Sequence, residues 1–329
     1  LVQISSLIDI VEGDLLNSPF ISFIYSFKTD PSKVKEGDLF IAKDTDSIPL
    51  AVQNGAFAIL MYENHPIIDN EIAWIKVKDI DLAVVQLIRF KLANYNLEAY
   101  YTDCLTLDLL NTFSQSSTKS IRFIGDINSF IKTIDDIEDG DILVSKNKAI
   151  LDKVYPDNRY FNEYKYEYEN LVRHSLFEIS FTHNDVFFSK LKIPTIYIED
   201  FLAVYNFLDL PLDYSKLKNI SHFRPIFLDK SLDIIEFGKS DKFLICQTDD
   251  NLMIKELDYL EKNFKYAKKM YITNSYKNFL NDKQIVVDTV DEIREILKIN
   301  SFNLVYIIGF EYLDVYTSLE GLEKQPTLF

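Results

Sequence analysis

Residues 28–63, KTDPSKVKEGDLFIAKDTDSIPLAVQNGAFAILMYE, carry the pattern that decides the fold of this chain. An apolar strand is predicted over residues 39–42, and a short amphipathic helix follows around residues 50–54. Gly55 ends this helix, and residues 57–61 form a second apolar strand. A strand, a helix and a strand in this order make a βαβ unit. We therefore expect two parallel strands with the helix on one face of the sheet.

The composition indicates a folded protein of more than one domain. The chain has 329 residues, which suits two or three domains, and its hydrophobic fraction of 47% argues against disorder. The formal net charge of −16 disfavours binding to nucleic acids and to anionic membrane surfaces. Two cysteines, Cys104 and Cys246, occur in no CxxC motif, so they are expected to be small core residues and not zinc ligands.

The expected location is the cytoplasm. No run of about 18 apolar residues is present, so no membrane span is predicted. The N-terminal residues include Asp9, Glu12 and Asp14, where a signal peptide would have basic residues.

Strand and helix patterns alternate along the remaining chain, which predicts an α/β fold. The first helix should cover residues 4–11 and end at Gly13, and a helix over 79–94 has Asp79 or Asp81 as its N-cap. A β-hairpin is predicted over residues 175–193. The other expected elements are a helix over 199–208, strands over 242–246, 269–272, 283–287 and 304–308, and helices over 251–264 and 291–299.

The opening stretch resembles the first domain of the Mur ligases, which typically reads TDSRKVKPGDLFVA and later AIxxGAxAVVVE. The matching residues are Thr29, Asp30, Lys33, Val34, Lys35, Gly37, Asp38, Leu39, Phe40, Ala51, Gly55, Ala56 and Ala58. Mur ligases are ATP-dependent enzymes that add amino acids or peptides to UDP-N-acetylmuramoyl precursors of peptidoglycan. The resemblance implies an N-terminal βαβ domain over residues 1–97, a reduced central domain over 98–225 and a small Rossmann-like C-terminal domain over 226–329.

The segment that should carry the family's phosphate loop lacks the residues for it. Residues 98–115 read EAYYTDCLTLDLLNTFSQ, without glycine or lysine, and Asp103 stands where an anion would bind. A phosphate loop needs glycines to turn backbone N–H groups inward and a lysine to reach the phosphates. The family's metal-binding residues have no counterpart in residues 152–170 either. We therefore expect no ATP, no other cofactor, no metal and no catalytic residue.

The first-domain resemblance also points to a ligand site. Lys33 and Lys35 could contact the diphosphate of a UDP-sugar, beside Ser32 and the loop at Asp44. The alternative is that Pro31 and Gly37 only shape a surface turn, and this alternative is favoured.

Two further clusters of residues each allow a functional and an ordinary structural role. Asp135, Asp136, Glu138, Asp139 and Asp141 could hold a cation, but the spacing favours a solvated loop. The tyrosine segment, which we define as residues 155–168, could be a protein partner surface or an irregular connection packed on the core. Its candidate contact residues are Tyr155, Tyr160, Tyr164, Tyr166 and Tyr168.

The leading hypothesis is a degenerate, non-catalytic Mur ligase-like protein of a bacterium that binds a protein partner or acts as a scaffold. Its link to peptidoglycan and the cell wall rests on the resemblance. One alternative is a binder of UDP-sugars or UDP-muramoyl precursors, or a divergent ligase. Another is a structural subunit of a larger assembly that uses the tyrosine segment.

Overall fold

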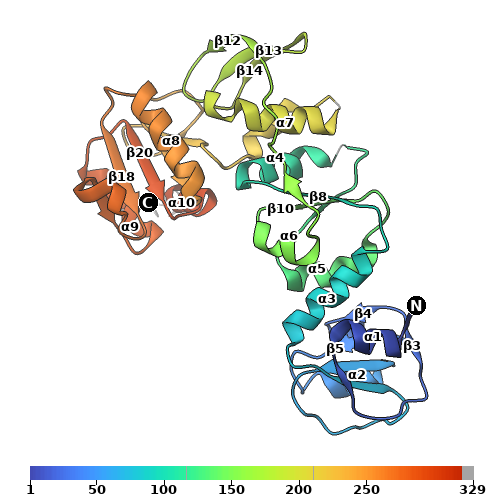
Figure 1. The fold of residues 1–329 in the computed structure, drawn as a ribbon. Helices are drawn as coiled ribbons and strands as arrows, with labels where there is room; N and C mark the ends of the chain where they lie inside the picture. The colour runs from blue at the N-terminus through green and yellow to red at the C-terminus, as the bar shows by residue number, and fades with distance from the viewer. Residues whose placement is uncertain (116, 210, 321–329) are drawn as a thin grey trace, which may run out of the picture. The chain divides into compact units, whose positions relative to one another are not determined.

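The computed structural model describes residues 1–115, 117–209 and 211–320, and Figure 1 shows sheets with helices packed around them. The chain divides into two compact units, Leu1–Asp103 with Ser117–Phe161, and Cys104–Ser116 with Asn162–Phe329. The mixed α/β class is confirmed, whereas the domain boundaries after residues 97 and 225 stay a prediction. Across the described residues, no helix combines the length and the apolar character needed to cross a membrane.

The first unit begins with a five-stranded sheet in the order β2-β7-β6-β5-β4. Only β2 runs antiparallel to its neighbour. The strands are β2 (Asp14–Leu15), β4 (Phe27–Lys28), β5 (Leu39–Ile41), β6 (Ala58–Met61) and β7 (Ala73–Lys76). Helix α2 (Ile48–Gln53) connects β5 to β6, and these strands pair in parallel. The predicted βαβ unit is confirmed.

A parallel four-stranded sheet in the order β11-β8-β10-β9 completes the first unit. Its elements are β8 (Glu98–Tyr101), β9 (Ile121–Phe123), α5 (Ile127–Thr133), η2 (Ile134–Asp136), β10 (Ile142–Ser145), α6 (Lys148–Val154) and β11 (Arg159–Tyr160). Helix α3 (Ile80–Leu92) packs against α1 (Ile4–Val11) and also against α5 and α6 (Figure 1). Its buried residues Val84, Leu87 and Ile88 join one apolar core that includes strands of both sheets. The unit also contains an antiparallel pair, β1 (Val2–Gln3) with β3 (Phe23–Ile24), and the short helix η1 (Pro31–Lys33).

Helix α1 ends differently from the prediction. The left-handed residue is Glu12, with φ of 51°, and not Gly13, whose N–H donates to the carbonyl of Ile8 at 3.1 Å. Gly13 is needed for space instead, because a Cβ there would lie 2.7 Å from Cγ2 of Ile75.

The structure selects Asp79 as the N-cap of α3. Its carboxylate accepts the backbone N–H groups of Asp81 and Leu82 at 2.9 and 3.0 Å. We expect Asp79→Ala to lower the free energy of unfolding by about 1 kcal/mol, because two helix N–H groups lose their acceptor. Urea denaturation measures this change. Asp81→Ala is the matched control and should cost less; equal losses would contradict the assignment of the cap.

The second unit contains helix α4 (Cys104–Ser114) and an antiparallel three-stranded sheet in the order β12-β13-β14. The strands β13 (Ile179–His183) and β14 (Val186–Leu191) confirm the predicted hairpin, and β12 (Glu169–Arg173) adds a third strand. Helix α7 (Ile198–Leu208), also predicted, packs on α4. The short helices η3 (Thr195–Tyr197) and η4 (Tyr214–Asn219) flank α7.

A six-stranded sheet in the order β16-β15-β17-β20-β18-β19 follows in the same unit. Strands β17, β20, β18 and β19 are parallel, and β15 and β16 are antiparallel additions at one edge. The strands are β15 (Pro225–Leu228), β16 (Ile234–Ile235), β17 (Phe243–Gln247), β18 (Lys269–Thr273), β19 (Gln284–Val286) and β20 (Leu304–Ile308). The helices are α8 (Asp250–Asn263), η5 (Asn278–Lys283), α9 (Val290–Ile299) and α10 (Tyr312–Glu320). The strands and helices expected in this region are confirmed.

The helices of this sheet lie on its two faces. Alternate residues of β17 and β20, including Cys246 and Ile307, join a core with α9 and α10. The side chain of Tyr306, which points to the opposite face, contacts Glu256 of α8. Adjacent strands β17 and β20 are therefore followed by helices on opposite faces. This arrangement is a topological switch point, and ligands of open α/β sheets bind outside the carboxyl ends of strands at such points.

Candidate functional site

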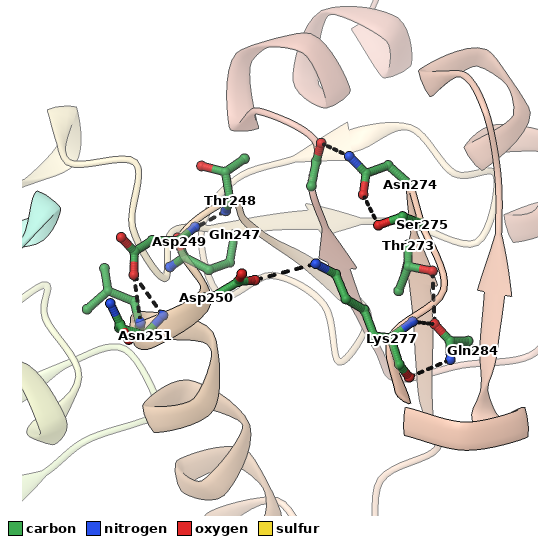
Figure 2. A network of polar contacts seen from close by, with 12 residues as sticks. Gln247, Thr248, Asp249, Asp250, Asn251, Thr273, Asn274, Ser275, Lys277 and Gln284 are labelled. Atoms are coloured by element: carbon green, nitrogen blue, oxygen red, sulfur yellow. Dashed lines mark hydrogen bonds and ion pairs between the residues drawn. The ribbon is translucent and has the colours of Figure 1, made fainter. Parts of the chain in front are cut away.

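Polar side chains gather at the carboxyl ends of β17, β18 and β20 in the second unit (Figure 2). The carbonyl oxygen of Gly309, after β20, accepts the side-chain amide of Asn274 at 3.0 Å. After β18, the carboxamide of Gln284 accepts the N–H of Lys277 and donates to its carbonyl, both at 2.8 Å. Lys277 also approaches Asp250 at 3.4 Å, which connects the loop after β18 to the start of α8. The strand ends are thus joined by their own side chains.

The N-terminus of α8 is capped from within the chain. The carboxylate of Asp249 accepts the N–H groups of Asn251 and Leu252 at 2.9 and 3.0 Å. The carbonyl oxygen of the Gln247 side chain accepts the N–H groups of Thr248 and Asp249. These four N–H groups already donate to protein oxygens, so they are not available to bind an anion.

A buried carboxylate lies below this edge. Glu256 of α8 is fully buried, and it accepts hydrogen bonds from the hydroxyls of Tyr197 and Tyr306 and, at 2.7 Å, from the amide of Gln247. Burial raises the pKa of Glu256 from 4.5 to about 7, and the three hydrogen bonds together with the charge of His222 limit the rise. Burial and the charge of Glu256 also raise the pKa values of Tyr197 and Tyr306 well above 10.

His222 connects this cluster to helix α4. Its Nε2 lies 3.3 Å from a carboxylate oxygen of Asp108. Burial of His222 opposes its charge, but the hydrogen bond and charge of Asp108, and the charge of Glu256, outweigh burial and raise the pKa of His222 above 6.5. We define the buried polar cluster as Tyr197, His222, Gln247, Glu256 and Tyr306, and the partly exposed Asp108 pairs with it through His222. The cluster can hold and exchange a proton near neutral pH.

A cavity of about 240 Å³ lies within the same unit, and His222 and Tyr197 of the buried polar cluster form part of its wall. Other parts of the wall come from α4, α7, η4, β15, β16 and α10, and from the segments before β13, after β14, before β15 and after β16. Most lining side chains are aromatic or aliphatic, which is typical of a site for a small organic ligand.

The four residues predicted to bind a UDP-sugar are all exposed. Asp30 accepts the N–H and hydroxyl of Ser32, and Asp44 accepts the N–H of Ser47, so two of these positions support turns. The small hollow beside Asp44 is lined by neither Lys33 nor Lys35. Ligand binding by these residues stays a prediction.

The tyrosine segment is divided between the two units. Tyr155 donates to the carbonyl of Leu97 at 3.1 Å, and Tyr166 and Tyr168 contact His183 and Phe181 edge to face. These three tyrosines are half-buried, whereas Tyr160 and Tyr164 are exposed. A partner surface in this segment stays a prediction, and its exposed part contains Tyr160 and Tyr164.

The acidic cluster is only partly the solvated loop that was expected. Asp136, Glu138 and Asp139 are exposed. Asp141 is buried and pairs with Nε of Arg122 at 2.9 Å, so the expectation is wrong for this residue. Asp135 binds Lys28 and Lys91 at 2.8 and 3.2 Å. Over the described ranges, no group of three or more His, Cys, Asp or Glu residues is placed to hold a metal ion.

The two cysteines differ from each other. Cys246 is a buried core residue, as predicted, and burial raises the pKa of its thiol far above the usual range. Cys104 is the first residue of α4 and is only half-buried, so it is not a core residue.

The sheets and helices define a mixed α/β protein with a candidate ligand cavity in its second unit. No protein-family model and no curated protein sequence matches the chain. Among solved structures, it is similar to the MurF ligase from Thermotoga maritima in complex with ADP. The TM-score is 0.57 at 13% identity, covering 90% of this chain and 97% of that chain.

Two structures from Acinetobacter baumannii are similar as well. For MurF the TM-score is 0.51 at 11% identity, covering 97% of this chain and 98% of that chain. The second structure is UDP-N-acetylmuramoylalanyl-D-glutamyl-2,6-diaminopimelate–D-alanyl-D-alanyl ligase. Its TM-score is 0.53 at 10% identity, covering 97% of each chain. At these identities the similarity concerns the fold: this chain has the fold of the Mur ligases, as its opening stretch suggested.

Proposed function

We propose that this chain is a non-catalytic protein with a Mur ligase fold that serves as a binding or scaffold component of peptidoglycan precursor synthesis in the bacterial cytoplasm. The similar solved structures are ligases, and one of them is a complex with ADP. The peptidoglycan context rests on that similarity of fold.

The connection between β8 and α4 carries the proposal. Strand β8 ends at Tyr101 and α4 begins at Cys104, so only Thr102 and Asp103 connect them. A loop that surrounds a phosphate group uses several residues, with glycines whose N–H groups turn inward. Neither connecting residue is a glycine or a lysine, and Asp103 would repel a phosphate. These features support the loss of ATP-dependent chemistry.

A thermal-shift titration tests the proposal. We expect Mg-ATP to leave the melting temperature unchanged, with a MurF ligase measured in parallel as the positive control. A ligand at about 100 times its dissociation constant adds roughly 2.7 kcal/mol to the free energy of unfolding, so binding would be visible. A shift with Mg-ATP, or release of ADP in the presence of a UDP-N-acetylmuramoyl precursor and an amino acid or dipeptide, would overturn the proposal.

The same titration separates the kinds of binding component. A shift with a UDP-N-acetylmuramoyl precursor alone would indicate a precursor binder, and Lys33→Met with Lys35→Met should then abolish it. Without such a shift, a scaffold that uses Tyr160 and Tyr164 is favoured, because these two residues are the exposed ones of the tyrosine segment. Replacing both with serine should then abolish binding to the partner, while replacement of the exposed Tyr266 should not.

A further inference from the structure

The cavity in the second unit has an apolar interior. Phe177 and Phe227 stack edge to face with centroids 6.0 Å apart, and Phe237 packs on both of them. Together with Ile193 of the segment after β14 and Leu109 of α4, these side chains line the space. The volume of about 240 Å³ is below the roughly 300–1,000 Å³ of sites for drug-sized ligands, so the ligand must be small.

The charges around this cavity are opposite to those of the chain as a whole. The formal net charge is −16, yet the described residues that line the cavity include Lys192, Lys218, Arg224 and the protonatable His222, and none of them is Asp or Glu. Chance would favour acids here, because the chain has 51 acidic residues against 35 Lys and Arg. The cavity is therefore a local site of positive charge on an acidic protein.

The three permanent cations differ in their surroundings: Lys192 and Lys218 are exposed, and the charge of Lys218 acts on Asp213, whereas Arg224 is partly removed from water. In the part of the chain that the structure describes, no ion pair joins Lys192, Lys218 or Arg224 to an acid. Arg224 lies instead over the ring of Tyr312 at 4.5 Å, and Lys192 over the ring of Phe237 at 4.9 Å. Arg224 is half-buried, and a cation removed from water is stabilised by an anion.

We propose that this cavity binds a small organic carboxylate with an aromatic or branched aliphatic body. The carboxylate pairs with Arg224, whose planar guanidinium matches it, and with the neighbouring lysines, while the body packs among the phenylalanines. Among the described residues, the lining contains no acid to accept an ammonium group, so the site selects against α-amino acids with the same hydrocarbon part. This site goes beyond the proposed function and does not depend on the loss of ATP binding.

Three ligands with the same phenylpropyl body test the proposal on the unaltered full chain. They are 3-phenylpropionate, the neutral 3-phenylpropanamide and L-phenylalanine, and isothermal titration calorimetry gives their dissociation constants. We expect the carboxylate to bind at least tenfold more tightly than the other two. No binding of 3-phenylpropionate, or affinities within threefold of one another, would overturn the proposal.

Variants then locate the site. Arg224→Met and Lys218→Met each keep a long side chain and remove a charge. Each should raise the dissociation constant of 3-phenylpropionate by fivefold or more. Lys216→Met is the matched control, because Lys216 belongs to the same short helix η4 but does not line the cavity. Unchanged affinity in the two lining variants, or an equal loss in the control, would place the ligand elsewhere and overturn the assignment.

Discussion

Glu256→Gln is expected to make the protein more stable at pH 8 and to change its stability much less at pH 5. The folded state holds the pKa of Glu256 at about 7, above the ordinary value of 4.5, because the carboxylate is buried. The folded protein therefore binds more protons than the unfolded chain between these two pH values. The free energy of unfolding falls as the pH rises from about 4.5 to about 7.

The size of this effect is large for one residue. A rise of the pKa from 4.5 to about 7 corresponds to roughly 3 kcal/mol of lost stability above pH 7. Glutamine has no charge to bury, and its carbonyl oxygen still accepts hydrogen bonds from Tyr197 and Gln247. We therefore expect the free energy of unfolding of Glu256→Gln, relative to that of the unaltered protein, to rise by roughly 2–3 kcal/mol between pH 5 and pH 8. Urea denaturation at the two pH values measures this difference.

Two comparisons make this result specific. Glu261→Gln, on the same helix, should have the opposite sign at pH 8, because Lys269 lowers the pKa of the exposed Glu261 carboxylate. The raised pKa of His222 depends partly on Glu256, and its stabilising contribution is lost as the pH rises through the folded-state value. Repeating the measurement in a His222→Gln background removes this contribution. If the free energies of unfolding of Glu256→Gln and of the unaltered protein changed in parallel with pH, the raised pKa of Glu256 would be contradicted.

Gly309→Ala is expected to destabilise the protein by roughly 2–4 kcal/mol. Gly309 has φ of 85°, a left-handed conformation that costs an L-residue about 1–2 kcal/mol. An added Cβ would also lie 2.2 Å from Oδ1 of Asn274, so the Asn274 side chain must move. That movement breaks the bond from Asn274 to the Gly309 carbonyl, worth about 1 kcal/mol, in the network of Figure 2.

Gly238→Ala is the matched control for this prediction. Gly238 has φ of 74°, and a Cβ there meets no atom within 4 Å. The control therefore measures the backbone conformation without the steric clash. Denaturation midpoints in urea should fall more for Gly309→Ala than for Gly238→Ala, and equal shifts would show that Asn274 adjusts without cost.

Much of the fold could be predicted because its elements follow from neighbouring residues. The apolar runs at β5 and β6 and the acidic N-cap of α3 are local patterns, and each element formed where its pattern lies. The end of α1 was predicted less well, because the helix was expected to end at Gly13, whereas the left-handed residue is Glu12. The actual role of Gly13 depends on Ile75, a residue of another strand.

The buried polar cluster and the cavity could hardly be predicted from the sequence. One signal was present: Glu256 stands on the apolar stripe of α8, four residues after Leu252 and four before Leu260. A carboxylate on a buried helical face indicates a paired or perturbed acid. No such signal marked the cavity, because Lys192, Lys218 and Arg224 belong to three separate segments.

The sequence alone determined the order and type of the elements, the βαβ unit and the absence of glycine and lysine between β8 and α4. These depend on side-chain periodicity and backbone freedom over a few residues. Only the tertiary structure decided which polar groups meet. Tyr197 and Tyr306 reach Glu256 from 59 and 50 residues away, on different elements. Such contacts arise because burying the apolar faces of α4, α7 and α8 fixes where the polar side chains between them must lie.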